Sequence, residues 1–284
     1  MPSLLDIRRR IRSVKNTQQL TKAMKTVSAA KLRRAQERVV SARPYANQLR
    51  HILGNLSGRI ENVQHPLLDV RPEKRILLLV VTSDRGLCGG FNSNLTKAAQ
   101  NFLRQRAGED VRLFTAGRKG RDFFRRRHAN IVSEYTNFFS KLDVGHAKDI
   151  AGQLIEMYSK AEIDAVYITY NEFKSVIQQR IVIEKLLPLS SADLTENFSG
   201  VEYIFEQPAQ EILNRLLPRY VEIEIYRAFL ESAAAEHGAR MAAMDTASRN
   251  AGEMIESLTL NMNRIRQAAI TREIIEVVSG AGVH

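Results

Sequence analysis

Apolar side chains recur at alternating steps of three and four residues from Leu4 to Leu56. This spacing is typical of the heptad seam of a coiled coil, in which one stripe of a helix is covered by a partner helix. Twelve of the sixteen positions are apolar, and the four polar ones, from Gln18 to Ser28, are consecutive, so we expect a weak seam there. Pro44 is expected to kink the helix or to mark a junction. The positions are Leu4, Ile7, Ile11, Val14, Gln18, Thr21, Lys25, Ser28, Leu32, Ala35, Val39, Ala42, Ala46, Leu49, Leu53 and Leu56.

A second seam with the same spacing runs from Ile212 to Ile275 in the C-terminal part of the chain. At about 1.5 Å per residue, the two helices would be roughly 80 and 100 Å long, which exceeds a compact domain of this size. We therefore predict that they pair as one antiparallel coiled coil. Pro208 suits a first helical turn, and Pro218 is expected to bend the helix. Fourteen of the nineteen positions are apolar: Ile212, Leu216, Arg219, Ile223, Tyr226, Leu230, Ala233, His237, Arg240, Met244, Ala247, Ala251, Met254, Leu258, Asn261, Ile265, Ala268, Arg272 and Ile275.

Between the seams, strand-like runs alternate with helical segments. Strands are predicted over 75–81, 111–116, 165–170 and 176–187, and helices over 92–106, 119–127 and 147–161. This alternation favours a Rossmann-like α/β domain with a mostly parallel sheet. The predicted fold class is therefore α/β plus coiled coil, with the α/β domain inserted between the two helices. The predicted domains are an N-terminal coiled-coil helix over 1–58, an α/β globular domain over 73–205 and a C-terminal coiled-coil helix over 208–284.

Positive charge is concentrated in the first helix. Residues 1–50 contain 13 Lys or Arg against Asp6 and Glu37, and the difference of +11 equals the formal net charge of the whole chain. A local surplus of this size indicates an acidic partner. A basic coiled-coil protein that binds nucleic acid is the alternative interpretation. It is disfavoured because residues 1–44 contain no aromatic side chain that would stack on bases.

The segment 82–92 (TSDRGLCGGFN) stands where α/β folds place phosphate-binding loops, after a strand and before a helix. It lacks the Gly-Lys-Ser/Thr ending of a nucleotide-binding loop and the G-x-G-x-x-G spacing of a dinucleotide site, so a tightly packed turn is favoured. Cys88, the only cysteine, has no motif that supplies a base and is predicted to be a buried thiol. The six histidines include no pair at i, i+4. We therefore predict no catalytic residue, no bound metal and no cofactor.

The sequence shows no membrane or secretory signal. No stretch approaches 18 consecutive apolar residues, so no membrane span is predicted. The N-terminus lacks a secretory pattern, which leaves the chain in the compartment where it is made.

A second basic cluster lies in the middle domain. It is consistent with nucleic-acid binding, although a solvated helix face or a protein contact is favoured. The cluster consists of Arg118, Lys119, Arg121, Arg125, Arg126 and Arg127.

Three groups of motifs together resemble one protein family. Near the start stand residues 7–8 (IR), 16–24 (NTQQLTKAM) and 41–45 (SARPY), and in the middle stands 83–92 (SDRGLCGGFN). Near the end stand 239–241 (ARM), 263–271 (NRIRQAAIT) and 279–281 (SGA). Their order and spacing resemble the gamma subunit of F-type ATP synthases over essentially all 284 residues.

The resemblance implies a function and partners. The two helices would form a shaft inside a ring of three alpha and three beta subunits, which hold the nucleotide sites. The α/β domain would lie beside the epsilon subunit and on the membrane ring of c subunits. The chain is then expected to be the central rotor shaft, which couples proton flow through the ring to ATP synthesis on the beta subunits. It would be a non-catalytic, regulatory and torque-transmitting subunit, peripheral on the cytoplasmic face of a bacterial plasma membrane rather than on a mitochondrial matrix face.

The resemblance also implies two groups of beta-subunit contacts and one group of c-ring contacts. The first group would face the acidic lever loop of a beta subunit: Lys22, Met24 and Lys25. The second would touch a catch loop higher in the head: Arg266, Gln267, Thr271 and Glu273. The c-ring contacts would be Tyr203 and Phe205. The chain departs from the family pattern in lacking the cysteine-bearing insert of chloroplast members, so no redox control is expected, and in having no basic residue over 280–284.

Overall fold

The computed structural model describes residues 4–57, 65–175, 178–189 and 208–281. The chain divides into two compact units, one of residues 1–28 with 240–284 and the other of residues 29–239. The two long helices, α1 (Leu4–Ser57) and α6 (Ala209–Ala281), each contribute to both units. No helix within the described ranges is long and apolar enough to cross a membrane. The three-part domain division predicted from the sequence stays a prediction.

The heptad seam predicted for the first helix is confirmed in α1. All sixteen predicted positions are buried or half-buried, and most residues between them are exposed. The helix is continuous through Pro44, so this proline marks no junction, and α6 is likewise continuous through Pro218. A helix loses one backbone hydrogen bond at an internal proline. Burial of the seam residues that precede and follow the proline offsets that loss.

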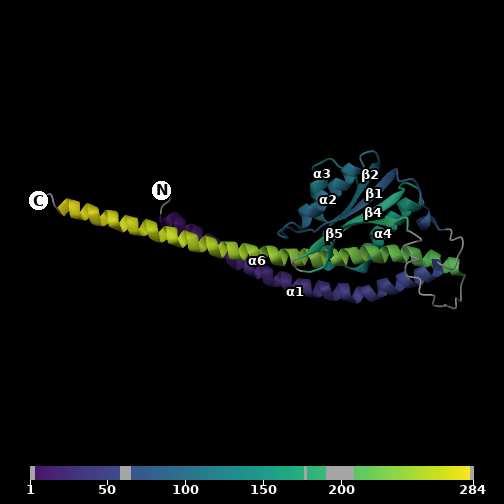
Figure 1. The fold of residues 1–284 in the computed structure, drawn as a ribbon, viewed down its shortest axis with the longest axis horizontal. Helices are drawn as coiled ribbons and strands as arrows, with labels where there is room; N and C mark the ends of the chain where they lie inside the picture. The colour runs from purple at the N-terminus through teal and green to yellow at the C-terminus, as the bar shows by residue number, and fades with distance from the viewer. Residues whose placement is uncertain (1–3, 58–64, 176–177, 190–207, 282–284) are drawn as a thin grey trace. The chain divides into compact units, whose positions relative to one another are not determined.

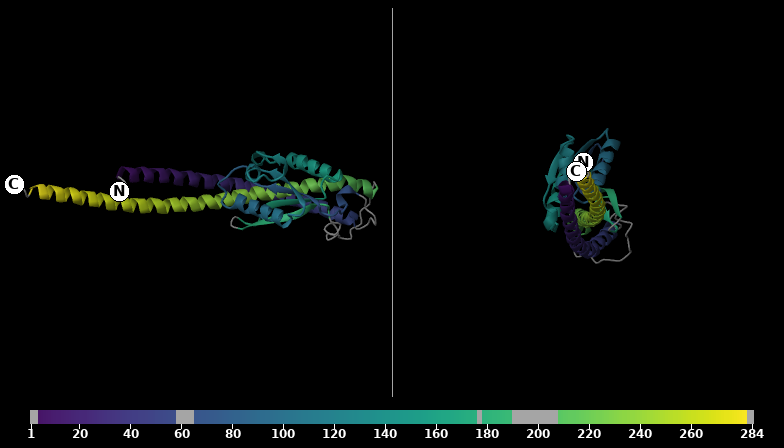
Figure 2. Two further views of the ribbon diagram at one scale, coloured as in Figure 1. Left: turned by 90° about the horizontal axis from the view of Figure 1, so that it is seen from above. Right: turned by 90° about the vertical axis from the view of Figure 1, so that its left-hand side faces the viewer.

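In the unit of residues 1–28 and 240–284, the ends of α1 and α6 pair in antiparallel fashion. Gln18 Nε2 donates to the carbonyl of Ser248 at 3.3 Å, and Lys25 Nζ lies 2.6 Å from Asp245 Oδ1. The order of these pairs along the two helices fixes their opposite directions. The C-terminal end of α6 continues beyond the N-terminal end of α1 (Figure 2). The last predicted seam positions are therefore exposed, because no partner helix reaches them: Ala268, Arg272 and Ile275.

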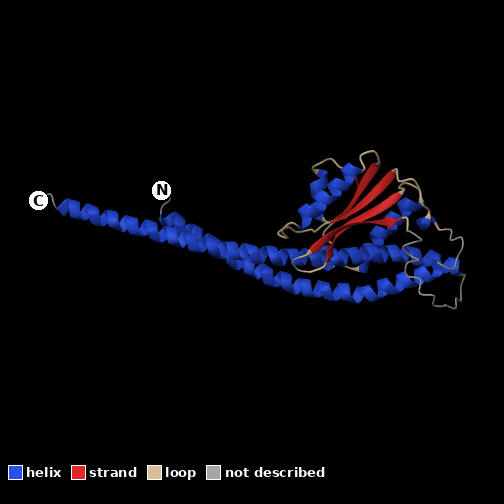
Figure 3. Ribbon diagram, viewed as in Figure 1, coloured by secondary structure: helices blue, strands red, loops and turns tan. Residues whose placement is uncertain are grey.

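The unit of residues 29–239 contains a five-stranded sheet in the order β3-β2-β1-β4-β5 (Figure 3). Its strands are β1 (Arg75–Val81), β2 (Asp110–Ala116), β3 (Ile131–Tyr135), β4 (Ala165–Phe173) and β5 (Gln179–Leu187). The first four are parallel and β5 is antiparallel to β4, so the predicted mostly parallel, Rossmann-like sheet is confirmed. Strand β3 was not predicted. It is a short edge strand whose residues alternate between half-buried and exposed, so it lacks the apolar run that identifies β1.

Three helices accompany the sheet: α2 (Phe91–Gln105), α3 (Arg118–Arg125) and α4 (Val144–Ser159). Each lies within three residues of its predicted bounds. Figure 1 shows α2 and α3 on one side of the sheet and α4 on the other. Side chains from α2 and α3, among them Leu95 and Phe124, pack against Ile76, Leu78 and Val80 of β1 in one buried cluster. Short 3-10 helices lie at Pro66–Leu68 and Phe139–Lys141.

Candidate functional site

The cationic surplus of α1 faces outward. Of the 13 Lys and Arg side chains in residues 1–50, all are exposed except Lys25 and Arg50, which are half-buried. The seam residues face α6, so charge and packing occupy different faces of one helix. The outward face is therefore available to an acidic partner.

The three predicted lever-loop contacts differ in their surroundings. Lys22 is exposed and Met24 is half-buried. Lys25 pairs with Asp245 of α6 and holds the pKa of that carboxyl below its usual value by a charged hydrogen bond. Lys25 therefore contributes to the seam, and Lys22 is the freer of the two cations to meet another subunit.

The predicted catch-loop contacts lie on α6, beyond the region that α1 covers. All four are exposed, and the hydroxyl of Thr271 donates to the carbonyl of Gln267 at 2.9 Å. Arg266 follows Asp245, the partner of Lys25, by 21 residues, which corresponds to roughly 30 Å along the helix. The structure thus places the two predicted contact groups at separate levels of the coiled coil. The predicted c-ring contacts, Tyr203 and Phe205, lie outside the described residues.

The glycine-bearing loop between β1 and α2 is closed by hydrogen bonds between Ser83 and Asn92 at its two ends. The backbone N–H of Ser83 donates to Asn92 Oδ1 at 3.0 Å, and Asn92 Nδ2 donates to Ser83 Oγ at 2.7 Å. The buried thiol of Cys88 packs with Phe91 and with Ala235 of α6. These contacts give the loop a packing role, because it closes on itself and docks on α6.

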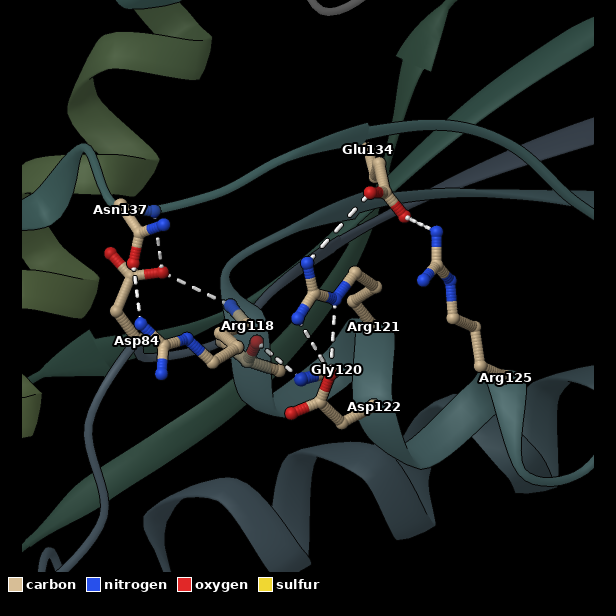
Figure 4. A network of polar contacts seen from close by, with 9 residues as sticks. Asp84, Arg118, Gly120, Arg121, Asp122, Arg125, Glu134 and Asn137 are labelled. Carbon is tan, nitrogen blue, oxygen red and sulfur yellow. Dashed lines mark hydrogen bonds and ion pairs between the residues drawn. The ribbon is translucent and has the colours of Figure 1, made fainter.

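Asp84 connects this loop to two other strand ends (Figure 4). Its Oδ1 accepts hydrogen bonds from the backbone N–H groups of Arg118, at 3.0 Å, and Asn137, at 2.9 Å, and its Oδ2 accepts one from the N–H of Phe139 at 3.4 Å. The ring of Phe139 lies 6.0 Å from that of Phe229 on α6. Asp84 therefore positions the carboxyl ends of β1, β2 and β3 together above α6.

The basic cluster of α3 is largely engaged within its own domain (Figure 4). Arg125 Nη2 lies 2.8 Å from Glu134 Oε2, and Arg121 lies 2.8 Å from Asp122 and 3.8 Å from Glu134. The guanidinium of Arg127 stacks 3.7 Å from the ring centre of Phe123. These pairings favour a structural role for the cluster over nucleic-acid binding.

Three acidic residues that were not predicted as site residues pair with cations of α1. They are Glu224, Glu231 and Asp245, all on α6. Each directly follows a predicted seam position from which the next seam position is three residues on, which is a b position of the heptad. Interhelical ion pairs usually lie at e and g, so the spacing gave no signal for these three residues. Among the described residues, no group of three or more His, Cys, Asp or Glu side chains is arranged to hold a metal ion.

A family model and curated relatives identify the protein family of this chain. A family model described as ATP synthase matches residues 3–282, which is nearly the whole chain. The ATP synthase gamma chain of Solibacter usitatus is 56% identical over 285 residues, which is 99% of each chain. That of Pelotomaculum thermopropionicum is 52% identical, again over 99% of each chain. The chain belongs to the ATP synthase gamma chain family.

Solved structures show the same fold. A chain in the central stalk and c-ring structure of Tetrahymena thermophila mitochondrial ATP synthase is 26% identical, with a TM-score of 0.63 over 81% of this chain and 99% of that chain. A chain of the Euglena gracilis mitochondrial ATP synthase is 18% identical, with a TM-score of 0.69 over 98% of this chain and 93% of that chain. The coiled coil with an inserted α/β domain is therefore a shared architecture.

Proposed function

We propose that this chain is the central rotor shaft of an F-type ATP synthase, which couples proton flow through a membrane ring of c subunits to ATP synthesis on beta subunits. It turns inside a head of alpha and beta subunits and contacts an epsilon subunit and the c ring. It acts as a non-catalytic subunit that transmits torque and takes part in regulation. Membership of the gamma chain family and the likeness to a central-stalk chain support this proposal.

The observation that carries the proposal is the outward cationic face of α1, whose seam is covered by α6 within the same chain. A helix that has satisfied its apolar seam internally and still presents dense positive charge is suited to an acidic surface around it. Charge attraction is non-directional, and salt screens it strongly only beyond about 8–10 Å. It therefore persists as a shaft turns past successive partners. Torque is then transmitted by shape, while charge keeps the surfaces in contact.

The proposed contacts follow the placement of the residues. Lys22, Met24 and Lys25 would face the beta lever loop, with Lys22 presenting the freer charge. The exposed set on α6 would touch the catch loop: Arg266, Gln267, Thr271 and Glu273. Tyr203 and Phe205 would contact the c ring. The chain would be held at the cytoplasmic face of a bacterial plasma membrane through these partners.

Native mass spectrometry of the complex purified through a tag on this chain tests the proposal. We expect one copy of the chain with alpha, beta and epsilon subunits. Recovery of the chain with nucleic acid, or with neither alpha nor beta subunits, would contradict the shaft and favour the basic coiled-coil alternative. None of the matches reported above is described as a nucleic-acid-binding protein.

A further inference from the structure

Two ion pairs cross the coiled coil one heptad apart within the unit of residues 29–239. Arg43 Nη2 lies 3.2 Å from Glu231 Oε1, and Arg50 Nη2 lies 2.9 Å from Glu224 Oε1. Both steps are seven residues, forward on α1 and backward on α6, so the pairs belong to a single antiparallel register. The side chains of Glu231 and Glu224 are only 4% and 8% exposed. A buried carboxylate is costly unless it is paired, so these pairings are required rather than incidental.

The first pair extends to the sheet. The second oxygen of Glu231 accepts a hydrogen bond from the backbone N–H of Phe173, in β4, at 3.2 Å. The neighbouring Ser232 hydroxyl accepts one from the N–H of Asn171 at 3.4 Å. One carboxylate on α6 therefore holds α1 with one oxygen and β4 with the other.

The second pair also reaches the sheet, through another arginine. Glu224 Oε2 accepts from Arg227 Nε at 2.8 Å, and Arg227 Nη2 lies 3.2 Å from Glu184 Oε1 of β5. Burial raises the pKa of Glu184, and the charge of Arg227 opposes that rise. Two arginines and two glutamates alternate from α1 through α6 to β5, so the chain of charges is balanced.

The apolar seam at this level mixes small and large side chains. The small ones are Ala42 and Ala46 on α1 and Ala233 on α6, and the large ones are Leu49, Ile223 and Leu230. The alanines carry little shape information, so they do little to oppose a shift of one heptad. A buried ion pair does not tolerate the same shift, since it would leave a carboxylate without its partner. Buried polar groups at defined positions are known to specify register in coiled coils.

We propose that Arg43–Glu231 and Arg50–Glu224–Arg227–Glu184 form an ionic clamp that fixes the register of α1 on α6 and ties both helices to the β4–β5 edge of the sheet. The mechanical role of the clamp rests on the proposed rotor function: the clamp makes α1, α6 and the sheet turn as one body. Torque that enters through the α/β domain would then reach both helices.

The register can be measured on the isolated full-length chain, without any assumption about the complex. Spin labels on cysteines introduced at the exposed positions Val40 and Asn214 report a distance along the helix pair, and Cys88 is buried away from the reagent. In the chain that keeps all clamp residues, we expect one narrow distribution of the distance between the two spin labels. Glu224→Ala with Glu231→Ala should broaden it or add a second distance about 10 Å away, which is the rise of one heptad. A single unchanged distance would overturn the proposal.

Two further variants keep this test decisive. Glu222→Ala removes an acidic residue of α6 that pairs with Arg219 of the same helix at 2.7 Å, so it should leave the distance unchanged. If the double alanine variant fails to fold, both pairs can be replaced by apolar residues, with Arg43→Met, Glu231→Leu, Arg50→Met and Glu224→Leu. This variant buries no unpaired carboxylate at these positions, and we still expect the second register. A folded apolar variant with one narrow, unchanged distance would overturn the clamp.

The torque part of the proposal is tested in the assembled complex. Clamp variants that assemble should pump at least about threefold fewer protons per ATP hydrolysed, whereas Glu222→Ala should not. Full coupling in a variant with a proven register shift would overturn the torque role and leave the rotor function standing. Absence of alpha and beta subunits in the native mass spectrum would instead contradict the rotor function, and the measured register would be unaffected.

Discussion

The ammonium nitrogen of Lys25 lies 2.6 Å from Oδ1 of Asp245, across the polar part of the seam between α1 and α6. The two side chains are 45% and 39% exposed, and Arg249 approaches the same carboxylate at 3.6 Å. Lys25 thus has a partner within its own chain, although its position also makes it a proposed lever-loop contact. Charge reversal at Lys25 would affect both roles, so the two must be separated by experiment.

A charge swap separates them. Lys25→Glu places two carboxylates together and should lower the unfolding temperature of the isolated chain, whereas Lys25→Glu with Asp245→Lys should restore most of that loss. Lys22→Glu, at an exposed position, should change it little. Thermal unfolding followed by circular dichroism measures all three. Failure of the swap to recover stability would show that the pair does not contribute to the seam.

The same variants test the lever contact in the assembled complex. Lys22→Glu should replace attraction by repulsion at each beta subunit that the shaft passes. A penalty of about 1–2 kcal/mol at one angle slows rotation roughly five- to thirty-fold. We expect the swap variant also to be impaired if the half-exposed side chain at position 25 meets the lever loop, because its seam is repaired while the charge at position 25 is reversed. ATP-driven proton pumping compared with ATP hydrolysis in vesicles gives the result, and unchanged pumping per ATP in both variants would count against a torque contact here.

Asp164 should give the α/β domain a defined sensitivity to acid. Its oxygens lie 2.7 and 3.2 Å from the guanidinium of Arg75, and Oδ2 also accepts the backbone N–H of Arg75 at 2.9 Å. The hydrogen bonds from the Arg75 side chain lower the pKa of this buried carboxyl. The stabilisation is therefore fully present above the unfolded pKa of about 3.9 and is lost as the pH falls through the lower folded-state pKa.

Urea unfolding between pH 7 and pH 2 measures this contribution. Asp164→Asn should cost on the order of 1–3 kcal/mol at pH 7, because the guanidinium of Arg75 loses a charged acceptor, and should flatten the acid limb of the stability curve. Asp110→Asn removes a more exposed carboxylate, which lies 2.8 Å from Arg112, and should cost less. Equal losses in the two variants would contradict the role assigned to Asp164.

Gly117 should be intolerant of any side chain. It has φ of 115° at the start of α3, and an added Cβ would overlap the carbonyl of Thr82. Gly117→Ala should therefore destabilise the chain by at least about 2 kcal/mol, from backbone strain and the clash together. Gly152 lies inside α4 with open space around it, so Gly152→Ala should stabilise by about 0.5–1 kcal/mol. Changes in unfolding free energy that have the same sign in both variants, relative to the unmodified chain, would contradict this account.

Periodicity along the chain predicted the elements that depend on burial. The seam of α1 and strand β1 were recovered because each buries a continuous set of apolar side chains. Strand β3 was not predicted, because this edge strand is held by backbone hydrogen bonds to β2. Such bonds leave no pattern in the polarity of the side chains. Residues that work across elements were also missed, since Glu231 is explained by Arg43 and Phe173, which are distant in sequence. The contacts with other subunits remain predictions, because a single chain does not contain their partners.

The proposed rotor function requires this chain to rotate within the complex. Arg126 is exposed at the end of α3, so a bead or rod attached through Arg126→Cys would report motion of the α/β domain while buried Cys88 stays unlabelled. With the head immobilised through its beta subunits and ATP supplied, we predict continuous rotation of the probe in one direction, with three pauses in each turn. A probe that stays fixed while the same complexes hydrolyse ATP would contradict the rotor function.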